Sequence, residues 1–180
     1  MSSLDTSARR VLLASLGAAL FILSLGAIDP LTRDVVNLPA LIPPFGASTV
    51  IVFYAPDTAA SRPWSVVVGH VGSALVACAV LWLLPGASIT TLAALAVVGA
   101  GVWMVLSRSI HPPGGATALF TTLGGLERGI AALLLPLIAG CIALVSIRWV
   151  LDWGSKRWRQ RASFERVVAE SLPPQAQGSL

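Results

Sequence analysis

Four long apolar stretches decide what kind of fold this chain can adopt. They comprise residues 11–28, 64–84, 89–106 and 130–150 and carry almost no charge. Each is close to the ~20 residues that a helix needs to cross the roughly 30 Å hydrocarbon core of a bilayer. Of the 180 residues, 56% are hydrophobic and 11% are charged, which leaves too little polar surface for a soluble domain. The sequence excludes a soluble enzyme, a disordered chain and a disulfide scaffold, and it predicts an all-α membrane protein with four transmembrane helices.

The positive charges gather beside the apolar stretches at the two ends of the chain. Arg9 and Arg10 precede the first stretch, and residues 156–166 contain five Lys and Arg. With four spans, both groups lie on one side, and we expect the other side to hold fewer basic residues: Arg33, Arg62, Arg108 and Arg128. Basic flanks stay on the cytoplasmic side. The sequence therefore predicts a multi-pass protein of the cell (inner) membrane with both termini cytoplasmic. Its expected partner is the lipid bilayer and not a nucleic acid.

A six-residue pattern occurs twice, 69 residues apart. Residues 43–48 and 112–117 both read Pro-Pro-x-Gly-Ala-Ser/Thr, and a short apolar run follows each copy. This duplication predicts two membrane repeats, residues 11–84 and 85–150, the arrangement that many transporters use. The repeats are flanked by a cytoplasmic N-terminus, residues 1–10, and a basic cytoplasmic tail, residues 151–180. We expect residues 155–170 to be either a basic helix along the membrane or a solvated tail, and residues 172–180 to be disordered.

Each copy of the pattern also has a local meaning. Prolines cannot continue a preceding helix, and the glycine permits close backbone approach. The short apolar runs span about 10 residues, or ~15 Å as a helix, so they predict two re-entrant half-helices, giving helix–re-entrant half-helix–helix repeats. Helix N-termini offer N–H groups and partial positive charge to an anion. The expected anion contacts are Phe45, Gly46, Ala47, Ser48, Gly114, Gly115, Ala116 and Thr117. Pro-rich loops at the membrane surface are the alternative.

Three further polar residues adjoin these segments. Arg108 is expected either to supply positive potential at the anion site or to reach the membrane interface. His111 is expected to tune or gate the site, or to hold the Pro-Pro turn. His70 is either an interhelical hydrogen-bonding residue or a gate. The apolar stretches contain no deep carboxylate, and the sequence has no metal-binding cluster, nucleotide loop or paired catalytic acids. We therefore expect no enzymatic activity, no cofactor and no metal.

These residues carry a family resemblance. Residues 44–48, then Gly69-His70, then His111-Pro112-Pro113 with residues 114–117, resemble the HPP family of integral membrane proteins over roughly residues 10–150. The resemblance implies a four-span membrane protein. It also implies nitrite transport, because chloroplast and cyanobacterial members are regarded as nitrite transporters.

The sequence thus favours a carrier or channel for a small inorganic anion. The resemblance makes nitrite the expected anion. Four spans give little wall around a pathway, so a homo-oligomer is expected. Two alternatives remain open at this point. One is a channel for a small neutral solute, in which the helix dipoles only orient the solute. The other is a non-transporting membrane scaffold or sensor that acts through the basic tail.

Overall fold

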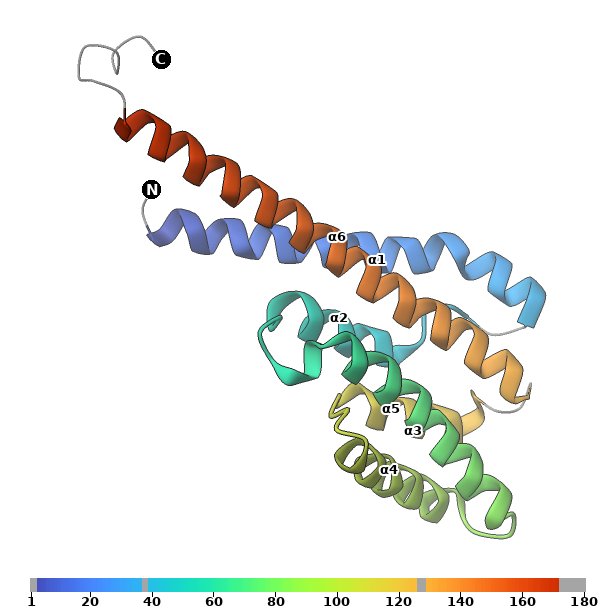
Figure 1. Ribbon diagram of the computed structural model, residues 1–180. Coiled ribbons are helices and arrows are strands. Elements are labelled where there is room, and N and C mark those ends of the chain that lie inside the picture. The colour runs from blue at the N-terminus through green and yellow to red at the C-terminus, as the bar shows by residue number, and fades with distance from the viewer. Residues whose placement is uncertain (1–2, 37–38, 126–128, 172–180) are drawn as a thin grey trace.

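Helices joined by short connections, without strands, make up the residues that the computed structural model describes, which are 3–36, 39–125 and 129–171 (Figure 1). The predicted disorder of residues 172–180 concerns residues outside this part. In chain order the elements are α1 (Ser3–Val36), α2 (Pro43–Tyr54), η1 (Ala59–Ser61), α3 (Pro63–Leu83), α4 (Ile89–Leu106), α5 (Pro113–Phe120), η2 (Thr121–Gly125) and α6 (Ile130–Ser171).

Four of these helices are long and apolar enough to cross a membrane, which confirms the predicted fold class. The candidate spans are Ala8–Asp34, Pro63–Leu83, Ile89–Leu106 and Ile130–Gly154. The first and last helices extend beyond the apolar stretches, because polar residues with good helix propensity continue the helical backbone. In particular, α6 runs without a break to Ser171. No helix end separates the fourth span from the first part of the predicted tail.

The two short helices α2 and α5 occupy the middle of the bundle. α2 packs against α1 and α6, and α5 packs against α3 and α4. α2 and α5 also contact each other, so they join the α1–α6 pair to the α3–α4 pair (Figure 1). Each short helix begins within its Pro-Pro pair, where the missing N–H of proline costs no helical hydrogen bond.

The direction of α2 differs from the re-entrant prediction. At its start, the Ala40 N–H donates to Asp29 Oδ1 over 2.8 Å. At its end, the Tyr54 and Ser15 hydroxyl oxygens are 2.9 Å apart. Asp29 and Ser15 are 14 residues apart on α1, or about 21 Å along the helix axis. α2 therefore carries the chain to the opposite end of the bundle, and α3 begins at the end where α1 begins (Figure 1).

The second half of the chain mirrors this path. The Trp64 Nε1–H donates to the Ser107 carbonyl over 3.1 Å, which ties the start of α3 to the end of α4. α5 begins at this end and leads through η2 toward the other end, where α6 begins (Figure 1). α2 and α5 thus run in opposite directions. The lengths of the two apolar runs alone underestimated how far α2 and α5 carry the chain across the bundle. Each helix starts inside its Pro-Pro pair, before the apolar run, and the non-helical connections supply the remaining distance.

This path also corrects the expected distribution of charge. Arg62 and Arg108 flank the Trp64–Ser107 contact, so they lie at the end of the bundle where α1 begins. The sequence prediction placed them at the opposite end because it assumed that each motif returns to its own side.

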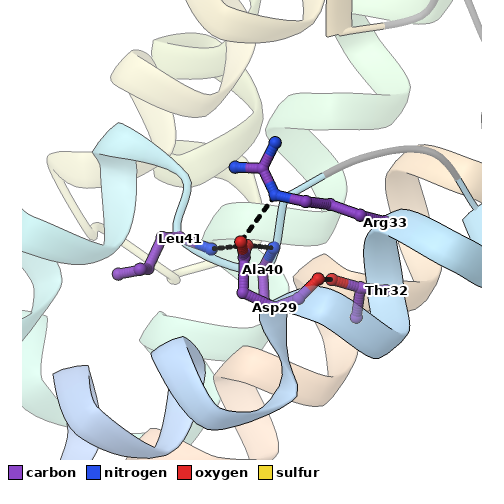
Figure 2. A network of polar contacts seen from close by, with 5 residues as sticks. All are labelled: Asp29, Thr32, Arg33, Ala40 and Leu41. Atoms are coloured by element: carbon purple, nitrogen blue, oxygen red, sulfur yellow. Dashed lines mark hydrogen bonds and ion pairs between the residues drawn. The ribbon is translucent and has the colours of Figure 1, made fainter.

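A carboxylate fixes the stretch that leads into α2. Figure 2 shows Asp29 accepting hydrogen bonds from the backbone N–H of Ala40 and Leu41, at 2.8 and 3.5 Å, and from Arg33 Nε at 2.6 Å. The Thr32 hydroxyl donates to the Asp29 carbonyl over 3.0 Å. These bonds satisfy backbone N–H groups that lie outside a helix. Inside a membrane, such groups need a partner within the protein. Asp29 lies seven residues before the end of α1, so the stretch that leads into α2 contacts α1 about 10 Å before that end.

Candidate functional site

Four polar side chains meet at the centre of the bundle. Ser48 comes from α2, His70 from α3, Thr117 from α5, and His111 from the connection before α5. All four have 0% of their surface exposed. We call them the central polar cluster. Polar groups inside an apolar membrane bundle are costly unless they satisfy one another, and they are functional-site candidates by default.

Short contacts link the cluster into a continuous chain of hydrogen bonds. Ser48 Oγ lies 2.7 Å from His70 Nε2 and 2.9 Å from His111 Nε2. His70 Nδ1 lies 2.6 Å from Thr117 Oγ1, and His111 Nδ1 lies 2.7 Å from the Ala60 carbonyl oxygen. The centres of the two imidazole rings are 4.8 Å apart. The chain of hydrogen bonds therefore runs from Thr117 through both histidines to Ala60 in η1.

The two hydroxyls occupy the same place in the two copies of the pattern. Ser48 and Thr117 are each the last residue of a copy, one helical turn after its second proline. Each hydroxyl also lies near the carbonyl of that proline, at 3.1 Å for Pro44 and 3.3 Å for Pro113. The prolines start the helix, and the helical period then directs the hydroxyl toward the cluster. The repeated pattern therefore encodes a repeated geometry.

Glycines bring α3 and α5 close enough for this arrangement. A Cβ on Gly69 would lie 2.8 Å from His111 Cβ, and a Cβ on Gly114 would lie 2.8 Å from both the Gly69 carbonyl oxygen and Ser73 Oγ. On the other side, the Phe45 ring packs edge-on against His70 at 5.6 Å between centres. The helix backbones and this ring exclude solvent from the imidazoles.

The structure brings together some of the residues predicted for the site and separates others. Those in or against the cluster are Phe45, Ser48, His70, His111, Gly114 and Thr117. The remaining predicted anion contacts of the two copies are not enclosed with it: Gly46, Ala47 and Ala116 are exposed and Gly115 is half-buried.

Some of the backbone donors expected at the two helix N-termini are already engaged. The N–H groups of Phe45, Gly114 and Gly115 donate to the carbonyls of Ile42, His111 and Pro112 over 3.0, 2.8 and 3.0 Å. These three N–H groups are therefore occupied, and the hydrogen bonds within the cluster are made by side chains.

Arg108 does not join the cluster. It is exposed and adopts φ 53°, directly after the last turn of α4. Its N–H donates to the Val105 carbonyl over 3.2 Å, and the Ser109 N–H donates to the Met104 carbonyl over 2.9 Å. Arg108 thus occupies the left-handed position that usually ends a helix with glycine. Its guanidinium supplies charge at one end of the bundle and not at the centre.

Sequence reasoning missed the pairing of the two histidines and the role of Ala60. His70 and His111 are separated by 41 residues and were considered separately. A usable signal existed, because Gly69 directly precedes His70 and a pattern copy directly follows His111. In the part of the chain that the structure describes, no three His, Cys, Asp or Glu side chains form a group that could hold a metal ion.

The fold and the cluster define a multi-pass helical membrane protein with a buried polar centre. The model of the HPP transmembrane region matches residues 4–160 of this sequence, and the chain belongs to the HPP family. It is 33% identical over 120 residues to a transmembrane protein of Dictyostelium discoideum, covering 64% of this chain and 42% of that protein. A second transmembrane protein of the same organism is 36% identical over 109 residues, covering 58% and 35%.

The chain spans less than half the length of either of these relatives. No solved structure matches it.

Proposed function

We propose that this protein transports a small inorganic anion, with nitrite as its substrate, through the central polar cluster. The observation that carries the proposal is the complete burial of two imidazoles and two hydroxyls where two short helices cross in an apolar bundle. Burying polar side chains inside a membrane bundle costs free energy, and close packing of the helices does not require polar residues there. A membrane transport role also fits the HPP family, whose resemblance suggested nitrite.

The cluster has the chemistry that a small anion needs. An anion that leaves water loses its hydration and must find hydrogen-bond donors in the protein. The hydroxyls of Ser48 and Thr117 and the N–H groups of His70 and His111 are such donors, and the hydroxyls can rotate. An anion would take over the hydrogen bonds that these side chains make to one another. α2 and α5 lead to the cluster from opposite ends of the bundle, an arrangement that suits alternating access.

Charge at one end of the bundle supports both orientation and anion attraction. The end where α1 begins carries Arg9, Arg10, Arg62 and Arg108. At the other end, Arg33 is paired with Asp29. By the positive-inside rule the first end faces the cytoplasm, so we place both termini there, in the cell membrane. The exposed Arg62 and Arg108 would raise the local concentration of anions near the cytoplasmic mouth. We also propose that copies of the chain associate, since four spans enclose little.

The test is solute flux into proteoliposomes that contain the purified chain. Nitrite is compared with nitrate, formate, chloride and glycerol, against protein-free liposomes. We expect protein-dependent nitrite flux that falls about tenfold or more in Thr117→Val, which removes one donor at nearly constant volume. Tyr54→Phe is the matched control, because it removes an exposed hydroxyl bonded to Ser15 outside the cluster.

Three other results would contradict the proposal. Glycerol flux without nitrite flux would assign the cluster to a neutral solute. Equal loss in Thr117→Val and Tyr54→Phe would show that the cluster has no special part in transport. No flux of any solute in correctly folded protein would favour a scaffold or sensor role.

A further inference from the structure

The hydrogens of the central polar cluster follow by elimination when all its groups are neutral. The Ala60 carbonyl can only accept, so His111 Nδ1 carries a hydrogen and His111 Nε2 accepts. Ser48 then donates its one hydrogen to His111 Nε2 and accepts from His70 Nε2. His70 Nδ1 is left to accept from the Thr117 hydroxyl. Every bond in the chain therefore points one way, from Thr117 toward Ala60.

One added proton fits on either imidazole without loss of a hydrogen bond. With the proton on His70, both ring nitrogens donate, to Ser48 and to Thr117, and the Thr117 hydroxyl turns to the Pro113 carbonyl at 3.3 Å. His70 Nε2 can then pass its proton to Ser48 Oγ while Ser48 passes its own to His111 Nε2. One N–H and one O–H bond break, and one O–H and one N–H bond form. The donor and acceptor atoms of these two steps are 2.7 and 2.9 Å apart.

The helices around the two imidazoles contribute no charge. Within their bounds, α2, α4 and α5 contain no Asp, Glu, Lys or Arg, and neither do η1 and α3. The charged residues of the adjoining connections, Asp57, Arg62 and Arg108, are exposed. On α6, Arg148 pairs with Asp152 near the far end of the span. Beyond the span Ile130–Gly154, α6 carries further Lys, Arg and Glu residues from position 156 on. Within α2, α3, α4, α5 and this span, the other titratable side chains are Tyr54 on α2, Cys78 on α3 and Cys141 on α6.

The cluster consequently has no permanent cation. Burial disfavours an imidazolium without a counter-charge, and it equally disfavours an anion without one. Each ion removes the penalty of the other, so proton binding and anion binding favour each other by linkage.

We propose that the protein carries its anion together with one proton, which is held by the His70–His111 pair and passed between them through Ser48. This coupling rests on the proposed anion transport and specifies how the anion's charge is compensated. It predicts electroneutral movement of the pair, driven by a pH difference and indifferent to membrane potential.

The test uses the full chain in proteoliposomes in mildly alkaline buffer, where the free acid form of nitrite is scarce. Exchange of isotopically labelled nitrite, with equal nitrite and equal pH on both sides, first establishes transport. Net uptake is then driven either by an alkaline interior or by a potassium diffusion potential that is positive inside. We expect protein-dependent accumulation with the first and none with the second.

Two serines on neighbouring helices supply matched variants. Ser48→Ala removes the hydroxyl between the imidazoles and is expected to lower pH-driven accumulation about tenfold or more. Ser73→Ala removes a fully buried hydroxyl on α3 that has no hydrogen-bond partner among the residues that the structure describes. Accumulation by this variant should match that of the unmodified protein. Helix content and monodispersity in detergent are checked for both variants. His111→Gln serves as the second variant if Ser48→Ala is unstable.

The failures of the two proposals are distinguishable. Nitrite exchange with uptake driven by potential and not by the pH difference would overturn the coupling and leave anion transport standing. pH-driven uptake that is unchanged in both Ser48→Ala and His111→Gln would overturn the assignment of the proton to this pair. Absence of labelled nitrite exchange would overturn the anion transport itself.

Discussion

The two motif helices share five of six pattern positions and differ at the third, where α2 has Phe45 and α5 has Gly114. The Phe45 ring reaches α6, and a Cβ on Gly140 would lie 2.2 Å from Phe45 Cζ. Gly114 instead places the backbone of α5 directly against Gly69 of α3. The shared positions build the hydrogen-bonded centre. The position that differs determines how each motif helix packs against a long span. α2 packs the Phe45 ring against a glycine of α6, and α5 packs its backbone against the backbone of α3.

The largest expected effect comes from making α2 resemble α5 at this position. Phe45→Gly removes a fully buried ring that packs against Phe21 and His70. We expect a loss of about 3–5 kcal/mol in the free energy of unfolding, as for other buried aromatic truncations. Chemical unfolding in detergent micelles measures it. Val50→Ala, at an exposed position of the same helix, is the control, and an equal loss there would refute the packing role of Phe45.

The converse change adds volume to α5. A methyl group on Gly114 would meet the Gly69 carbonyl oxygen, which belongs to a helix backbone and has little room to move. We expect Gly114→Ala to lower the free energy of unfolding by up to about 3 kcal/mol through overpacking. Gly115→Ala is the matched control, because in the described part of the chain no atom beyond its own turn of helix lies within 4 Å of its Cβ position. If the two adjacent variants unfold alike, the close approach of α3 and α5 is incorrect.

The shared hydroxyl position can be tested by exchange between the copies. Thr117→Ser gives α5 the hydroxyl residue of α2 and keeps the bond to His70, so nitrite flux should persist. Thr117→Val leaves His70 Nδ1 without its 2.6 Å partner, and we expect a stability loss of about 1–2 kcal/mol. Thermal unfolding and liposome flux on the two variants separate the hydroxyl from the methyl group. A loss in Thr117→Ser with none in Thr117→Val would show that the side-chain volume, and not the hydrogen bond, matters.

The smallest effect concerns the connection that leads to the second motif. Arg108 has φ 53°, where glycine is favoured over other residues by about 1 kcal/mol. Arg108→Gly should therefore be more stable than Arg108→Ala by about that amount in thermal unfolding.

Both Arg108 variants should also reduce nitrite flux at low ionic strength and approach the unmodified rate at high salt, because the lost charge acts at a distance. A salt-independent loss would place Arg108 nearer the pathway than its exposure indicates.

The sequence predicted the spans well and the path between them poorly. Helix type and the limits of α3 and α4 follow from apolar length, a property of each stretch alone. The course of α2 depends on contacts such as that between Tyr54 and Ser15, 39 residues apart, which no local pattern reports.

The candidate site was predicted in the same uneven way. The pattern located Ser48 and Thr117, because their position follows from the proline that starts each helix. The meeting of His70 with His111 depends on how closely Gly69 lets two helices approach, which is a property of the packed bundle. The expected role of Arg108 depended on proximity in sequence, and its left-handed backbone turns it away from the centre.

The Asp29 carboxylate has a mechanical consequence. It holds Ala40 and Leu41 from a position inside α1, so the first long helix and the start of α2 are fastened to each other at a point well below the helix end. Movement of α1 and movement of the stretch that leads into α2 are therefore coupled through one carboxylate.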